Sequence, residues 1–360
     1  MHARPRITAY CLEWHASRSR AFYDMLVEPV SEHVEVALVA WDGQSPLPPA
    51  VGDAGTPLVF CQLPPPASVF ERAGARVVWL PMFDQADGYG TDWWNGLDKR
   101  LRVVSFSRAL TRRAQAVGLK VLPLQLFKNP RDFAPANWSE GLVGFYWNRT
   151  GLASPRFLER FCATLQLKKL LFLPTLDPHI PTGVAYSLPP RLGGAVVQQV
   201  GADWDRAAFL KSIEKANVFL APRAREGVGM LMLELMARGC AVFAYDGPTM
   251  SEYVAHGENG YLFPRAVPRN PVVNLTRRLG HAAKRRMGVP APAFGLDDRQ
   301  NWPALAAVSP RRIGDCARQR SEAGFAAWVL RHDEYASFLL DWGDGNRGAR
   351  ETLTEDHRES

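Results

Sequence analysis

The chain has 360 residues, 47% of them hydrophobic, and a formal net charge of +7 at pH 7. That apolar content excludes a disordered chain, and the length favours two globular domains of about 100–200 residues each. No stretch approaches the roughly 20 consecutive apolar residues that cross a bilayer, so we do not expect a membrane-spanning protein.

The cysteines and the N-terminus indicate the compartment. The five cysteines are scattered through apolar runs without the C-x-x-C spacing of a metal or redox site, which favours a reducing environment. The first 20 residues contain charged side chains and lack the apolar core of a signal peptide. We therefore expect a cytoplasmic protein.

The N-terminal part of the sequence alternates short apolar runs with amphipathic stretches such as Ser107–Val117. Strands that alternate with helices predict βαβ units and a mostly parallel sheet, with functional loops at the strand ends. The predicted strands are Arg6–Leu12, Val34–Trp41, Pro57–Gln62, Arg76–Phe83, Arg102–Ser107 and Lys120–Phe127.

A break follows at Lys128–Ser139, where Pro, Asn and Asp cluster without periodicity, and we expect a linker there. The same alternation then starts again. The predicted strands are Gly141–Trp147, Lys169–Pro174, Ala195–Val200, Asn217–Pro222, Ala241–Tyr245 and Gly260–Phe263. The predicted helices are Ser154–Leu165, Asp205–Lys215, Val228–Arg238 and Thr249–His256.

The predicted class is therefore α/β, with two domains that leave a cleft between them. The sequence after Pro310 predicts helix through Trp342. We expect an N-terminal domain at 1–138, a second domain at 139–315, helices at 316–342 that pack back on the N-terminal domain, and a disordered tail at 343–360.

The most informative segment is the loop and helix that follow the strand Asn217–Pro222. Gly227 and Gly229 let a ligand approach the backbone, and the unpaired N–H groups at the start of the helix favour a phosphate. Glu226 precedes the helix and Glu234 lies within it, so two carboxylates flank the anion site. A carboxylate suits a vicinal diol, so a hexose on one side and a ribose on the other match a sugar nucleotide.

This part of the sequence resembles the C-terminal domain of retaining GT-B glycosyltransferases of the family 4-like group, which carry an E-x7-E motif. The resemblance covers about residues 140–263, and Val104–Ser107 and Asn129–Phe133 look like the strand and linker before that domain. It implies two Rossmann-like domains that face each other across a cleft. The matching stretches are Ala216-Asn-Val-Phe-Leu-Ala-Pro222, Glu226-Gly-Val-Gly229, Glu234-Leu-Met-Ala-Arg-Gly239, Ser251-Glu-Tyr-Val254 and Gly257-Glu-Asn-Gly-Tyr261.

The resemblance also implies roles for individual residues. Glu226 is expected to contact the donor sugar near the reacting carbon, Glu234 to bind the ribose, and Arg149 to bind phosphate. The family usually has a lysine about five residues after that arginine, and Arg156 is the candidate substitute here. The backbone amides expected to hold the diphosphate are those of Gly227, Val228, Gly229 and Met230.

The acceptor side is expected in the N-terminal domain, where Asp84, at the end of the strand Arg76–Phe83, is the candidate group. Trp93 and Trp94 fit either a platform for an acceptor sugar or core packing. Arg223 and Arg225 flank the donor loop, and solvated or interdomain pairing is favoured over contact with a phosphate or an anionic acceptor.

Two further motifs have a favoured and an alternative interpretation. Asp203-Trp-Asp205 spells the metal-binding D-x-D of a different glycosyltransferase fold, but a cap on the helix that follows is favoured, so no metal site is predicted. All charged residues in 265–286 are arginine or lysine. A basic helix over 272–287 would allow peripheral contact with an anionic membrane, although a helix packed on its domain with a solvated basic face is favoured.

The predicted function is that of a retaining hexosyltransferase. It moves a sugar from a UDP-, GDP- or ADP-sugar to a carbohydrate or lipid-linked glycan acceptor, as in the synthesis of a cell-surface polysaccharide. No tightly bound cofactor and no nucleic-acid partner are expected. Two alternatives stay open: a nucleic-acid-binding or DNA-modifying protein that uses 265–286, and a GT-B protein that binds nucleotide sugar without turnover.

Overall fold

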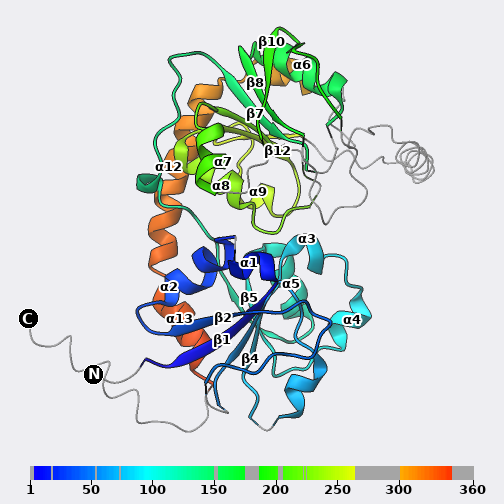
Figure 1. The fold of residues 1–360 in the computed structure, drawn as a ribbon, viewed down its shortest axis with the longest axis vertical. Helices are drawn as coiled ribbons and strands as arrows, with labels where there is room; N and C mark the ends of the chain where they lie inside the picture. The colour runs from blue at the N-terminus through cyan, green and yellow to red at the C-terminus, as the bar shows by residue number, and fades with distance from the viewer. Residues whose placement is uncertain are drawn as a thin grey trace, which may run out of the picture.

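The computed structural model describes residues 4–17, 19–52, 55–72, 74–149, 153–174, 186–201, 206–221, 223, 225–263 and 301–342. These residues form two α/β domains stacked end to end, with one long helix running beside both of them (Figure 1). Each domain is built on a largely parallel sheet, so the α/β fold class is confirmed.

The N-terminal sheet has the strand order β2-β1-β3-β4-β5-β6, and every neighbouring pair is parallel. The inner strands are runs of buried residues, as expected where helices cover both faces of a parallel sheet. All six predicted strands are present, but each is shorter than predicted. They are β1 (Arg6–Cys11), β2 (Glu35–Ala40), β3 (Leu58–Cys61), β4 (Val77–Leu80), β5 (Arg102–Ser105) and β6 (Lys120–Pro123).

The helices around this sheet are mostly one or two turns long. The helical segments are α1 (Glu13–Ser17), η1 (Tyr23–Val27), α2 (Glu28–Val30), η2 (Ala67–Glu71), α3 (Phe83–Ala86), α4 (Thr91–Asn95), α5 (Arg108–Ala116) and η3 (Pro130–Asp132).

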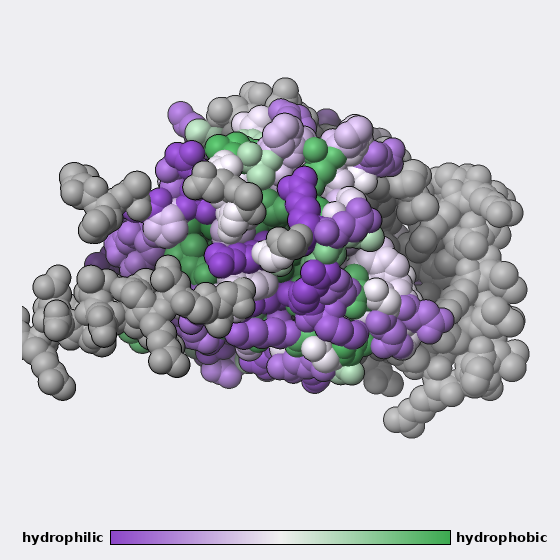
Figure 2. Space-filling view, turned by 90° about the horizontal axis from the view of Figure 1, so that it is seen from below, coloured by the Kyte–Doolittle hydropathy of each residue, from purple (hydrophilic) through white to green (hydrophobic). Residues whose placement is uncertain are grey.

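Seen from below, the end of the N-terminal domain that points away from the other domain is mostly hydrophilic, with its apolar side chains in small separate patches (Figure 2).

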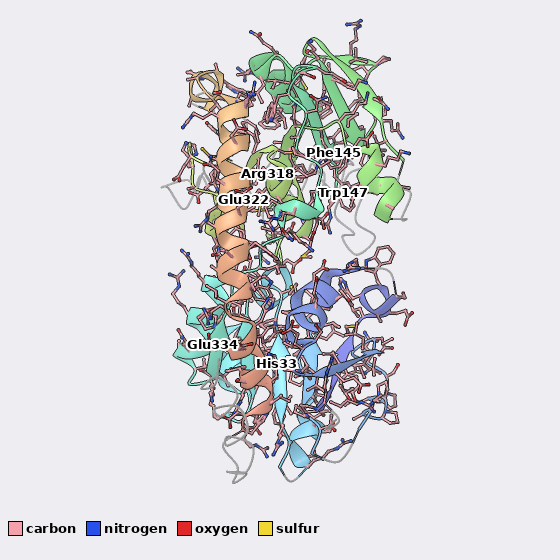
Figure 3. All side chains as sticks on the ribbon, turned by 90° about the vertical axis from the view of Figure 1, so that its left-hand side faces the viewer. His33, Phe145, Trp147, Arg318, Glu322 and Glu334 are labelled. Carbon is pink, nitrogen blue, oxygen red and sulfur yellow. The ribbon has the colours of Figure 1, made fainter. Side chains whose placement is uncertain are left out.

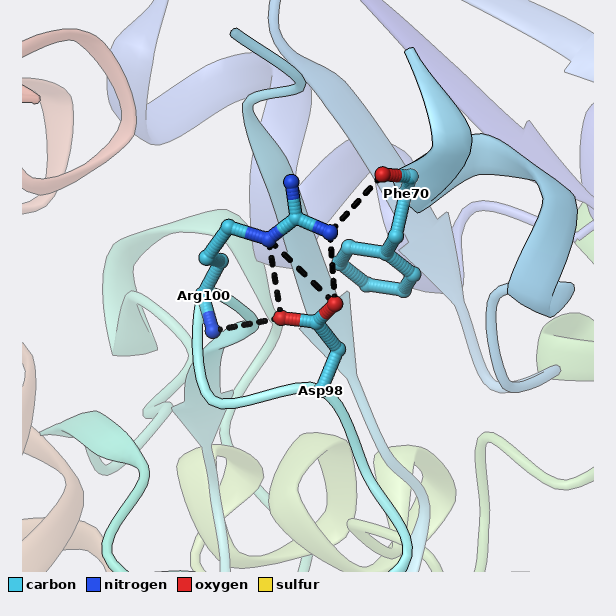
Figure 4. Close-up of polar contacts among 3 residues, drawn as sticks. All are labelled: Phe70, Asp98 and Arg100. Carbon is cyan, nitrogen blue, oxygen red and sulfur yellow. Dashed lines mark hydrogen bonds and ion pairs between the residues drawn. The ribbon is translucent and has the colours of Figure 1, made fainter. Parts of the chain in front are cut away.

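Arg100 holds the turn that leads into β5 (Figure 4). Its Nη2 donates to Asp98 Oδ2 at 2.6 Å and to the carbonyl of Phe70, in η2, at 2.7 Å. The hydrogen bonds from Arg100 lower the pKa of the Asp98 carboxyl. Since about half of the Arg100 side chain is exposed, the pair contributes little stability and mainly fixes the position of the turn beside η2.

The C-terminal sheet has the order β13-β12-β11-β7-β8-β10-β9, in which only the β9–β10 pair is antiparallel. β9, of two residues, was not predicted, because so short a strand has no recognisable alternation. The strands are β7 (Val143–Trp147), β8 (Lys169–Leu173), β9 (Arg191–Leu192), β10 (Ala195–Gln199), β11 (Val218–Ala221), β12 (Ala241–Tyr245) and β13 (Tyr261–Phe263). The helices are α6 (Pro155–Leu165), α7 (Arg206–Ser212), α8 (Met230–Arg238) and α9 (Met250–Tyr253).

The C-terminal helices are α11 (Asn301–Ala306), α12 (Pro310–Val329) and α13 (His332–Leu340), so the stretch predicted to be helical after Pro310 is helical with one break after Val329. The break after α12 lets α13 pack on α2 of the N-terminal domain, where His33 pairs with Asp333. In Figure 3, α12 runs beside the C-terminal domain and reaches the N-terminal domain, and it packs on α8 and β12.

Arg318, near the middle of α12, ties the two domains to this helix. It donates to the carbonyl of Ala237 in α8 at 2.8 Å and to that of Pro130 in the linker at 3.1 Å. One side chain therefore holds the helix, the C-terminal domain and the linker together.

Several predictions lie outside the described residues. They concern Asp203–Asp205, the basic segment 265–286 and the tail 343–360. Within the part of the chain that the structure describes, no helix combines the length and the apolar character needed to cross a bilayer.

Gly314 lets α12 approach the end of α8. A Cβ at this position would lie 2.3 Å from the carbonyl oxygen of Gly239 and 2.6 Å from Cζ2 of Trp138. Alanine normally stabilises a helix interior relative to glycine by about 1 kcal/mol. Here the oxygen belongs to the backbone and cannot swing aside, so we expect Gly314→Ala to lower the free energy of unfolding by about 1–3 kcal/mol.

Chemical denaturation of the native protein and of this variant measures the effect. Gly55→Ala is the matched control, since a Cβ there meets nothing within 4 Å. A Gly314→Ala protein that is as stable as the native one would show that α12 does not lie so close to α8.

Candidate functional site

The site lies where the two domains meet at the carboxyl ends of their strands. Segments that follow β4, β5 and β6 in one domain contact segments that follow β11 and β12 in the other, through Asp84, Ser107 and Gln125 on the N-terminal side. In the C-terminal sheet, the chain leaves β7 towards β8 on one side and returns through β11 on the other. Ligands of open α/β sheets bind at such a switch point, which here brings Arg149 and the loop after β11 together.

The loop after β11 contains an ion pair between Arg223 and Glu226. Only 11% of the Arg223 side chain and 12% of the Glu226 side chain are exposed. Arg223 Nη1 donates to Glu226 Oε2, and Glu226 Oε1 accepts from the Gly227 amide at 3.2 Å. The hydroxyl of Thr249 donates to the Glu226 carbonyl at 2.9 Å. Both the backbone and the carboxylate of Glu226 are therefore held in place.

The two arginines of this loop have different partners. The interdomain pairing that the sequence favoured is confirmed for Arg225, whose Nε lies 3.3 Å from Asp87 Oδ2 in the N-terminal domain. Arg223 is largely buried and pairs with Glu226 of its own loop, and its charge also acts on Asp84 of the N-terminal domain. Its spacing of three residues before Glu226 was the signal for this contact, because charges three apart in a turn come within reach of each other.

Asp84 reaches the loop after β11 from the opposite domain. A Cβ on Gly227 would lie 3.3 Å from Asp84 Oδ1. The predicted strand end is wrong here: β4 ends at Leu80, before Pro81, which has no amide for the sheet, and Asp84 lies in α3. Asp84 Oδ1 is buried and makes no hydrogen bond with the protein.

The charges around Asp84 identify the members of the site. Burial raises the pKa of the Asp84 carboxyl, and the negative charge of Glu226 raises it further. Arg223 and Arg149 oppose this shift, so all three side chains lie close enough to act on Asp84. The guanidinium of Arg149 lies over the Trp147 ring, 4.6 Å from its centre. Two acids and two arginines from both domains thus form one cluster.

The N-terminus of α8 begins beside this cluster, but later than predicted. The helix starts at Met230, because Gly229, in the left-handed region with φ of 79°, forms its N-cap. The Gly227 amide, predicted to hold phosphate, donates to Glu226 instead. Gly229 has no side chain to cap the helix, so the amides that open towards an anion are those of its first turn, Met230–Met232.

The other predicted residues lie further from the cluster. Glu234 is 2% exposed within α8, and its carboxylate therefore faces the protein interior. Arg156 has an exposed side chain in the first turn of α6 and is not among the charges that act on Asp84. Trp94 is fully buried, and Trp93 stacks on Tyr89 at 4.1 Å, so this pair forms part of the core.

A second contact between the domains was not predicted from the sequence. Glu252, in α9, accepts from the Arg108 amide at 2.7 Å and from the Ser107 hydroxyl at 3.2 Å. Its carbonyl accepts from Gln125 at 2.7 Å. Helix α5 has no acid in its first turn and Ser107 does not cap it, so Glu252 supplies the missing acceptor and negative charge from the other domain. The absence of an acid from the first turn of α5 is the feature of the sequence that could have indicated this contact.

The raised pKa of Asp84 predicts a dependence of stability on pH. A carboxyl whose pKa is higher in the folded than in the unfolded state contributes stability that is full below its ordinary pKa of 3.8 and is lost as the pH rises through the folded value. We therefore expect Asp84→Asn, which cannot ionise, to raise Tm at pH 8 and not at pH 3.5. Thermal unfolding at both values measures this, with Asp92→Asn, an exposed aspartate in α4, as control. An equal effect at both pH values would rule out the ionised carboxylate as the cause.

Comparison with known proteins gives a family match within the C-terminal domain. Residues 193–270, which contain the loop after β11 and all of α8, match the family described as "Glycosyl transferases group 1". A sequence comparison with curated proteins gives no match.

Solved structures with a similar fold include sucrose-phosphate synthase from Thermosynechococcus elongatus, at 15% identity and a TM-score of 0.57 over 93% of this chain and 99% of that chain. Anabaena HepE in complex with UDP and glucose is 12% identical, with a TM-score of 0.54 over 93% of this chain and all of that chain. A glycosyltransferase from Rickettsia africae is 11% identical, with a TM-score of 0.52 over 94% and 100%. The chain therefore has the GT-B fold of two Rossmann-like domains, and its residues 193–270 match the group 1 glycosyltransferases.

Proposed function

We propose that the protein is a retaining glycosyltransferase that takes a sugar from a nucleotide-sugar donor. The observation that carries this proposal is the convergence of Arg149, Arg223 and Glu226 at the N-terminus of α8, opposite Asp84 of the other domain. Cations and helix amides bind a diphosphate, and a carboxylate beside them accepts hydrogen bonds from sugar hydroxyls. The match of residues 193–270 to group 1 glycosyltransferases supports the same assignment.

The chemistry depends on the charge of the leaving group. When the bond between the anomeric carbon and the diphosphate breaks, negative charge develops on the phosphate oxygen. Arg149 and the first amides of α8 are fixed by the fold before the reaction, so they stabilise this charge without reorganisation. Glu226 orients the sugar through its hydroxyls, and Asp84 lies on the side from which an acceptor hydroxyl would arrive.

The proposed substrates follow from the resemblance and the structural relatives. HepE, with the same fold, binds UDP-glucose in its solved complex, so a UDP-hexose is the first donor to test. The acceptor is proposed to be a carbohydrate or a lipid-linked glycan, as in polysaccharide synthesis. The proposed ribose contact of Glu234 and the proposed phosphate contact of Arg156 rest on the resemblance. The side chain of Glu234 is buried, and the side chain of Arg156 is exposed away from the cluster.

Donor binding is tested by thermal unfolding with UDP-, GDP- and ADP-sugars. A ligand at 100 times its Kd stabilises the native state by about 2.7 kcal/mol, so at least one donor is expected to raise Tm measurably. Glu226→Ala and Glu234→Ala are expected to reduce this rise, and Glu258→Ala, an exposed acid in the same domain, is expected to keep it. If no donor raises Tm, and the two variants behave like the native protein, the donor assignment fails.

Turnover is tested with the donor that gives the largest rise in Tm. We expect Glu226→Gln to lower kcat by about 100-fold or more, since it removes a charge that acts at the reacting centre. Release of nucleoside diphosphate in the presence of candidate glycan acceptors measures the rate. A Glu226→Gln enzyme with native kcat would remove Glu226 from the reaction.

A further inference from the structure

The ion pair between Arg223 and Glu226 occupies the groups that a bound donor would need. Arg223 Nη1 donates to Glu226 Oε2, and both side chains are nearly nine-tenths buried. The other oxygen of Glu226 accepts from the Gly227 amide. Only Oε2 is therefore held by a side chain that can move, while Oε1 is held by the backbone.

The charges of the site make this ion pair important for the binding of a diphosphate. Asp84 and Glu226 balance Arg149 and Arg223 in the cluster. A nucleoside diphosphate brings at least two further negative charges, and buried charge without a partner is costly. While Arg223 pairs with Glu226, its charge is directed at that carboxylate and not at a bound diphosphate.

The geometry of the loop allows the guanidinium to change partner. The backbone of the loop is held by the bond from Thr249 to the Glu226 carbonyl, so the side chain of Arg223 can turn while the loop stays in place. Its fork of five N–H donors matches phosphate as well as carboxylate. The loop continues directly into α8, whose first amides favour the same anion.

We propose that Arg223 exchanges partners when the donor binds. Without donor it neutralises Glu226, and with donor it moves to the diphosphate and leaves Glu226 Oε2 to accept hydrogen bonds from the sugar hydroxyls. Arg223 then supplies the second phosphate cation that Arg156, exposed in α6, does not bring to the cluster. This inference rests on the proposed function.

The exchange predicts opposite effects for its two partners, and calorimetric titration of the full-length protein with UDP and with uridine measures them. We expect Arg223→Gln to weaken UDP binding about tenfold or more, because a charge-assisted hydrogen bond to phosphate is lost. Uridine, which has no phosphate, is expected to bind with the same affinity within about twofold. Glu226→Gln is expected to tighten UDP binding several-fold, because it releases Arg223 from a competing carboxylate.

A double-mutant cycle tests whether the two effects share one cause. In the Arg223→Gln background, the gain from Glu226→Gln is expected to vanish. Arg225→Gln is the matched control, because Arg225 lies two residues away, is half exposed and pairs with Asp87. Its affinity for UDP is expected to stay within about twofold of the native value.

Two results would overturn the exchange: native affinity of Arg223→Gln for UDP, or Glu226→Gln weakening UDP binding. The second would mean that the pair only keeps the loop in shape.

If Arg223→Gln does not fold, Arg223→Lys replaces it, since lysine keeps the charge without the fork. This variant is expected to weaken UDP binding by a smaller factor, and the effect of Glu226→Gln on UDP binding still decides whether the exchange occurs. If the native protein binds GDP or ADP instead of UDP, that nucleotide and its nucleoside replace UDP and uridine. Native protein that binds none of the three contradicts the proposed function itself.

Discussion

Glu226 carries its charge in a largely buried position, and the arrangement of the site follows from the need to balance that charge. Arg223 provides the balance from the same loop, and the Gly227 amide holds the second carboxylate oxygen. Asp84, from the opposite domain, lies close enough for the charge of Glu226 to act on it. Its pKa is raised because burial and Glu226 both oppose its ionisation. The site therefore contains a second carboxyl that is costly to ionise, and such costs are typical of residues kept for function.

The domain boundary combines apolar and polar contacts, because one cluster of buried hydrophobic side chains includes residues of both domains, among them Met82 and Val228. Glu252 completes the N-terminus of α5 from the other domain, and Arg225 pairs with Asp87. Phe127 and Tyr253 add one aromatic contact, with ring centres 5.4 Å apart. On the opposite side, α12 is bonded to both α8 and the linker through Arg318. Apolar packing, these polar contacts and α12 together set the two domains against each other.

Local patterns predicted most of the architecture, because buried parallel strands are apolar runs that need no partner to be recognised. They failed where an element was too short to show a period, as in α3 and β9. The start of α8 was misplaced by two residues, since a glycine can occupy either the helix or the left-handed cap that precedes it. In the site, the neighbours of Glu226 in the sequence predict a role for it, whereas the burial of Arg223 depends on the surrounding domains and cannot be predicted from the sequence around it.

The sequence by itself determined the two α/β units, the linker between them, and the loop and helix around Glu226, because each is encoded by residues close together in the chain. Only the tertiary structure decided that Asp84 faces Gly227 and that Glu252 completes α5. Those pairs lie more than a hundred residues apart, and no periodicity or spacing relates them. Their contact depends on how two separately folded sheets are set against each other by the linker and α12, and that geometry fixes which charges are buried together.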